Sequence, residues 1–106
     1  MLERDIEAYL VKRCASIGAL CDKFTSPQRR SVPDRLITFN GRVLFVELKA
    51  TGKKPTEAQA RDHERRRAAG AEVVWTDSIP GVDVIVGNLE AKWPLLTNEE
   101  FRVRGS

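Results

Sequence analysis

A chain of 106 residues with 42% hydrophobic and 31% charged residues has room for one globular domain with one core. No apolar stretch is long enough to cross a membrane, and the N-terminus lacks a signal-peptide layout, so we expect a soluble, cytoplasmic protein with no membrane partner. The net charge of +3 is mild, but the basic residues are clustered, as on nucleic-acid-binding proteins and also on ordinary solvated faces.

The first predicted element is an amphipathic helix over about residues 2–17, where apolar residues recur at helical spacing and Gly18 follows as a stop. Residues 19–24 then form a short strand, and residues 25–32 a basic loop. Cys14 and Cys21 follow no metal-ligand spacing, so we expect reduced, partly buried thiols.

Two β-rich runs, residues 35–39 and 42–49, are separated by Asn40-Gly41, the dipeptide that best fits the positive φ values of a type I′ turn. This pattern predicts a hairpin. In residues 43–46 both alternating sets of side chains are apolar, as in a strand covered on both faces. We therefore expect the hairpin to lie at the centre of the sheet.

The second half of the core is predicted to contain a helix over about residues 56–69, a strand over 72–75 and a helix over 78–89. The first of these helices is poor in large apolar residues. Only its alanines, at positions 58, 60, 68 and 69, are expected to face the sheet closely.

The element order αβββαβα predicts an α/β fold, a small mixed β-sheet with a central hairpin flanked by helices. We assign residues 1–89 to this core domain. Residues 90–106 are expected to form a C-terminal extension that packs on the core or on a partner subunit.

The hairpin turn also predicts where the charged residues lie. With a two-residue turn, Phe39 pairs with Arg42, so the register places Asp34 directly opposite Glu47. Facing carboxylates repel each other, and a divalent cation such as Mg²⁺ or Mn²⁺ would offset that repulsion. Lys49, on the same face, could steady a water or a developing negative charge. The alternative is a structural salt-bridge cluster in which Lys49 neutralises one of the acids.

Pro33-Asp34 followed, after twelve residues, by Glu47-Leu48-Lys49 resembles the PD-(D/E)XK nuclease superfamily. Within it the chain is most similar to the VRR-NUC family, especially its small standalone phage form, and secondarily to archaeal Holliday-junction resolvases. The resemblance covers about residues 2–89. It implies a restriction-endonuclease-like core and a metal-dependent endonuclease, a hydrolase that cuts DNA phosphodiester bonds. It also points to branched DNA as substrate, to a homodimer, and to no cofactor besides Mg²⁺ or Mn²⁺.

The family pattern implies further site residues. A first-helix glutamate three residues before an aliphatic residue matches Glu3 with Ile6, while Glu7, one turn on, is the rival. Gln59 matches a glutamine that usually follows the motif lysine. The implied metal ligands are Asp34, Glu47, the backbone carbonyl of Leu48, and Glu3; the implied catalytic set is Asp34, Glu47, Lys49, Glu3 and Gln59.

Four basic residues flank the strand ends where this site would open, and we expect them to contact the phosphate backbone: Arg29, Arg30, Lys53 and Lys54. His63 is expected to be an exposed helical histidine without a role. Two other functions stay open. One is a non-catalytic nucleic-acid-binding module of the same fold, and the other is a protein-interaction domain without salt-dependent DNA affinity.

Overall fold

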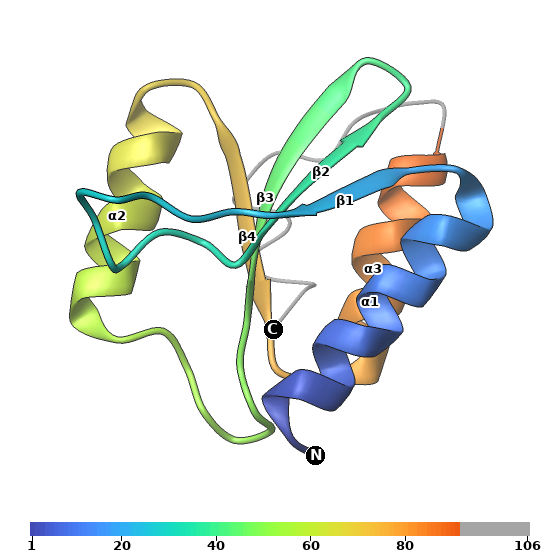
Figure 1. The fold of residues 1–106 in the computed structure, drawn as a ribbon, viewed down its shortest axis with the longest axis horizontal. Helices are drawn as coiled ribbons and strands as arrows, with labels where there is room; N and C mark the ends of the chain where they lie inside the picture. Colours follow the sequence, from blue (N-terminus) through green and yellow to red (C-terminus); the bar gives the residue numbers. More distant parts are fainter. Residues whose placement is uncertain (92–106) are drawn as a thin grey trace.

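Three helices and a four-stranded mixed sheet make up residues 1–91, the part of the chain that the computed structural model describes. Helices α1 and α3 lie together on one face of the sheet, and α2 lies on the other (Figure 1). Within these residues no helix is long and apolar enough to span a membrane. The elements are α1 (Glu3–Ile17), β1 (Leu20–Lys23), β2 (Arg35–Phe39), β3 (Arg42–Leu48), α2 (Glu57–Ala68), β4 (Glu72–Thr76) and α3 (Ile79–Glu90).

The strands lie in the order β1-β2-β3-β4. Neighbours β1, β2 and β3 are antiparallel, whereas β3 and β4 are parallel, because the chain crosses from one to the other through α2. The predicted fold class is confirmed, and the β2–β3 hairpin is central. Only the start of β3 departs from a strand covered on both faces, since Val43 is 49% exposed.

The turn between β2 and β3 has the predicted geometry, with φ of 48° at Asn40 and 83° at Gly41. The predicted register is also found, since Phe39 pairs with Arg42 and the ladder continues to Arg35 opposite Val46. Asp34 is the next residue beyond that ladder. The hairpin therefore carries Asp34 to the strand end at which Glu47 lies.

The apolar core lies between the sheet and the α1–α3 layer. Tyr9 and Arg13 of α1 both contact the carboxylate of Asp83 on α3, which ties the two helices together. Both cysteines are free thiols; Cys14 is buried and Cys21 half-buried. The fully buried apolar side chains here are Ile6, Leu10, Ile37, Leu44, Val46, Leu48, Val82, Ile85 and Val86.

Helix α2 contradicts one expectation, because its alanines do not face the sheet. The alanines at positions 58, 60, 68 and 69 are all exposed. The inward positions are Asp62 and His63, together with Arg66, whose guanidinium stacks over the Phe24 and Phe45 rings. Asp62 accepts a hydrogen bond from Arg66 at 2.7 Å, so the buried charges are paired. Long, paired polar side chains thus fill the space that alanines would have left empty.

The core ends close to the expected boundary. Helix α3 runs through Glu90, one residue past the predicted end at 89. The expected C-terminal extension, residues 90–106, lies from residue 92 onward outside the described residues.

The hairpin turn can be tested with Gly41→Ala. A left-handed φ costs an L-residue about 1–2 kcal/mol, and each kcal/mol shifts Tm by about 4–8 °C in a domain of this size, so we expect Tm to fall. Gly87→Ala is the matched control, because it adds the same methyl group to an exposed position in α3 with no atom within 4 Å. It should raise Tm, because alanine is favoured over glycine inside a helix by up to about 1 kcal/mol. Melting followed by circular dichroism measures both, and a Gly41→Ala protein as stable as wild type would contradict the turn assignment.

Candidate active site

Asp34 and Glu47 meet at the end of the hairpin, beside the peptide of Leu48. The Leu48 N–H donates a hydrogen bond of 2.8 Å to Asp34 Oδ2, which fixes the Asp34 carboxylate against β3. Glu47 lies in β3 on the α2 side of the sheet and is only 1% exposed. The sequence-predicted acids are therefore brought together, one of them inside the protein.

Burial of Glu47 has a large electrostatic effect. Desolvation first, and then the charge of Asp34, raise the pKa of Glu47 to about 9, against the opposing pull of Lys49. Within the described residues, Oε1 of Glu47 is buried without a hydrogen-bond partner. Such an atom costs about 1–3 kcal/mol. The part of the chain that the structure describes therefore holds a buried carboxyl group with one oxygen that it does not hydrogen-bond.

Lys49 lies near the acids without forming an ion pair with them. Its charge lowers the pKa of both Glu3 and Glu47. Yet among residues 1–91 no carboxylate oxygen lies within 4.0 Å of the Lys49 ammonium. The alternative of a structural salt bridge, in which Lys49 neutralises an acid directly, lacks the contact that it requires.

The two first-helix glutamates have different surroundings. Oε2 of Glu7 accepts hydrogen bonds from Arg35 at 2.7 Å and from Lys23 at 3.1 Å. Glu3 has no such partner among the described residues, and burial followed by the charge of Asp34 raises its pKa. The Glu3 carboxylate thus interacts with the charge of Asp34 in the site, whereas the Glu7 carboxylate is held in a structural ion pair.

Gln59 links the start of α2 to the buried acid. Its Nε2 donates to Glu47 Oε2 at 3.3 Å, while its Oε1 accepts from the Thr56 backbone N–H in a capping box. The same amide therefore closes the helix end and holds Glu47. Gln59, placed in the catalytic set by the family pattern, thus contacts Glu47 directly.

His63 was expected to be exposed, and this expectation was wrong. It is 2% exposed, and its Nε2 lies 3.7 Å from Glu47 Oε1, beyond hydrogen-bond range. Burial, and then the charge of Arg67, lower the pKa of His63 to about 4, so the ring is neutral at pH 7. The spacing could have revealed this, because His63 lies four residues after Gln59 and so on the same face of α2.

The predicted phosphate contacts divide into two groups. Arg29 and Arg30 are exposed in the β1–β2 loop and line a cavity of about 320 Å³ that also contains Asp34. Lys54 instead lines a separate cavity of about 290 Å³ next to His63, and Lys53 is exposed. The structure brings the loop arginines to the acids more directly than the two lysines.

The donors present suit a hard divalent cation only in part. Among the described residues, no three His, Cys, Asp or Glu side chains are close enough to hold a metal, so Glu3 does not complete a three-carboxylate cage. Two carboxylates, Asp34 and Glu47, remain, beside the Leu48 peptide whose N–H contacts Asp34. Mg²⁺ usually takes one or two carboxylates and keeps several waters, so this oxygen set and the unsatisfied Glu47 Oε1 fit it.

Comparison with known proteins decides the family. No family model matches the chain. Over 77 residues it is 49% identical to "Putative nuclease p44" of Acyrthosiphon pisum secondary endosymbiont phage 1, covering 72% of this chain and 83% of that protein. It also matches a solved structure of a VRR_NUC domain, with a TM-score of 0.74 and 33% identity over 80% of this chain and 94% of the other.

The chain belongs to the VRR_NUC nuclease family. The family predicted from Pro33-Asp34 and Glu47-Leu48-Lys49 is thus confirmed. The VRR_NUC fold holds these residues at the open end of the central hairpin, next to the first turns of α1 and α2.

The raised pKa of Glu47 predicts a pH-dependent stability in EDTA. Between pH 4.5 and about 9 the unfolded chain loses the Glu47 proton while the folded protein keeps it, so this group destabilises the fold as pH rises. Glu47→Gln removes the titration. We expect Tm of the variant to exceed that of wild type by a margin that grows with pH, reaching at least about 4–8 °C, or 1 kcal/mol, by pH 8.

His63 provides an internal check on this experiment. Its lowered pKa makes stability rise with pH between about 4 and 6.5, so above pH 6.5 a change in the difference between the two proteins reports Glu47 and not His63. Melting at several pH values gives that difference directly. A gap that stays constant from pH 5 to 8 would mean that Glu47 is ionised in the folded protein.

Proposed function

We propose that this protein is a Mg²⁺- or Mn²⁺-dependent endonuclease that hydrolyses phosphodiester bonds in DNA. The observation that carries the proposal is the pair of acids at the end of the hairpin, a buried Glu47 beside a half-buried Asp34. Glu47 is buried beside Asp34, with one carboxylate oxygen unsatisfied among the described residues. A fold stabilised by this arrangement alone would be better served by an apolar side chain.

Asp34, Glu47 and the Leu48 carbonyl would hold the cation, with Glu3 acting through water. A bound divalent cation supplies positive charge to the scissile phosphate and lowers the pKa of an attacking water. Lys49, free of a carboxylate partner among residues 1–91, can orient that water or stabilise charge on the phosphate. Gln59 keeps Glu47 oriented through its 3.3 Å hydrogen bond, and the neutral His63 lies 3.7 Å from the other Glu47 oxygen.

The finer substrate assignment is structure-selective cutting of branched DNA by a homodimer. It is supported by the family resemblance to junction resolvases and by the arginine-bearing loop beside Asp34, which suits phosphate contacts more than base readout. Sedimentation should give a mass of about twice the 11.9 kDa of one chain. A monomer at all concentrations would remove the homodimer from the proposal.

Cleavage of an end-labelled four-way junction, with Mg²⁺, Mn²⁺ or EDTA, tests the activity. We expect scission only with a divalent ion, and faster on the junction than on a linear duplex of the same sequence. Glu47→Gln and Lys49→Ala should each lower the cleavage rate by about 100-fold or more, the usual cost of losing a transition-state contact. Glu90→Gln and Lys12→Ala, which change the same charges at exposed positions, are the matched controls.

The result that overturns the proposal is DNA binding without scission in either metal. That outcome would favour the non-catalytic binding module. Loss of folding in both site variants, seen as a collapsed melting transition, would instead return the acids and Lys49 to a structural role.

A further inference from the structure

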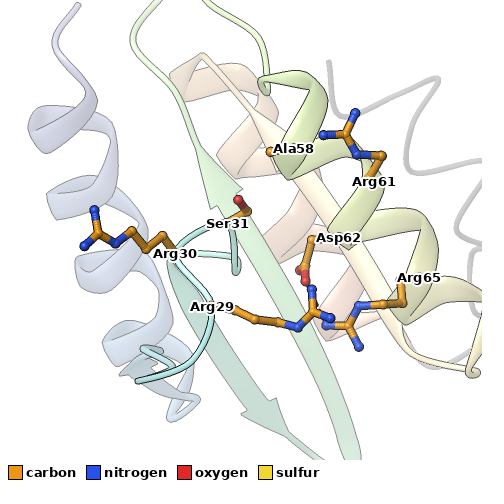
Figure 2. A pocket seen from close by; sticks show the side chains of 7 residues that line it. All are labelled: Arg29, Arg30, Ser31, Ala58, Arg61, Asp62 and Arg65. Carbon is orange, nitrogen blue, oxygen red and sulfur yellow. Dashed lines mark hydrogen bonds and ion pairs between the residues drawn. The ribbon is translucent and has the colours of Figure 1, made fainter.

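A cleft of about 430 Å³ separates the β1–β2 loop from α2 and is lined by four arginines. Arg29 and Arg30 come from the loop, whereas Arg61 and Arg65 come from the helix. Figure 2 shows the Arg29 side chain reaching across from the loop toward Arg65 and Asp62 on the facing wall. Neither Arg61 nor Arg65 was among the residues that the sequence suggested for binding.

The charge in this cleft is unbalanced. Its only lining carboxylate, Asp62, is 3% exposed and already accepts hydrogen bonds from Arg65 at 2.9 Å and from Arg66 at 2.7 Å. No carboxylate among residues 1–91 pairs with Arg29 or Arg30. Arg61 is 73% exposed on its side chain and reaches Glu57 only at 3.9 Å, a pair that contributes little.

In Figure 2 the Arg29 and Arg65 side chains point toward each other beside Asp62, whereas the Arg30 and Arg61 side chains point away from them at the edges of the cleft. Positive groups gathered around one carboxylate repel one another, and a further anion would offset that repulsion. A phosphate oxyanion is the best match, because the planar guanidinium presents paired N–H donors at the spacing of its oxygens. Asp62 fixes the Arg65 side chain in the cleft through their 2.9 Å hydrogen bond. The cleft is therefore built for a phosphate group.

The cleft adjoins the candidate active site. Arg29 and Arg30 line both this cleft and the neighbouring cavity that contains Asp34. A nucleic-acid strand with one phosphate at Asp34 would meet these arginines with a nearby phosphate. The cleft has the volume of a small-ligand site, so it suits a phosphate of one strand and not the width of a duplex.

We propose that the cleft formed by Arg29, Arg30, Arg61 and Arg65 binds a phosphate of the DNA strand near the cleaved bond. This inference rests on the proposed function for the identity of the strand. The phosphate is either an internal phosphodiester or a terminal phosphate. The two share their chemistry, and the experiment separates them.

The test is DNA binding in EDTA, followed by fluorescence anisotropy at several salt concentrations. The probe is a duplex with a single-stranded tail, made with either a 5′-phosphate or a 5′-hydroxyl. The variants are Arg29→Ala, Arg61→Ala and the double variant. Lys12→Ala is the matched control, because it removes one exposed charge from α1 on the opposite face of the sheet.

Each cleft variant should weaken binding by about tenfold or more, the usual effect of losing a hydrogen bond to a charged group. The slope of log Kd against log salt should fall by about 1 in each single variant and about 2 in the double variant. Lys12→Ala should change affinity by less than about twofold, because salt screens a distant charge. Equal losses on both probes identify an internal phosphate, and losses confined to the 5′-phosphate probe identify a terminal one.

The cleft assignment is overturned if the arginine variants behave like Lys12→Ala on both probes. Because the readout is binding without metal, it is independent of cleavage. Retained affinity in the cleft variants of an active nuclease would refute the cleft alone. Weakened binding in a protein that never cuts would refute the nuclease and keep the cleft.

Discussion

The register imposed by the Asn40-Gly41 turn is the constraint on which the rest of the site depends. With both turn residues at positive φ, the ladder runs without a slip from Phe39–Arg42 to Arg35–Val46. Because side chains alternate along a strand, this register puts Glu47 on the α2 side, next to Asp34, while its neighbours Val46 and Leu48 enter the apolar core. The same residues that make β3 a buried central strand thus force an acid into the interior.

That burial has an energetic cost, and α2 shows how the fold limits it. A helix of ordinary apolar residues would leave Glu47 against hydrocarbon. Here α2 presents Gln59, His63 and Asp62 inward, and only Gln59 hydrogen-bonds the acid. Asp62 forms ion pairs with Arg65 and Arg66, so its negative charge adds little repulsion to that of Glu47. The polar inner face of α2 therefore accommodates Glu47, although its Oε1 has no hydrogen-bond partner among residues 1–91.

The sequence predicted the parts of this structure that follow from local chemistry. The turn dipeptide and the apolar run of β3 each act through near neighbours, so the hairpin, its register and its central place in the sheet could be predicted. The packing of α2 could not be predicted, because the search for an apolar helix face does not anticipate an arginine that stacks on Phe24 and Phe45. For the same reason His63 was assigned to the surface.

The choice between Glu3 and Glu7 also required the structure. Glu3 and Glu7 differ by one turn of the same helix, and only the positions of Lys23 and Arg35 on neighbouring strands show that the Glu7 carboxylate is already paired.

The fold also separates positive from negative side chains around the site. The chain has a net charge of only +3, yet its arginines converge beside Asp34 while its least satisfied acid is buried behind it. In the proposed nuclease this separation gives the two groups different roles: the arginines attract a phosphate backbone, and the acids at the end of the hairpin hold the cation. Binding and cutting would then depend on different residues of one short surface, joined by the β1–β2 loop.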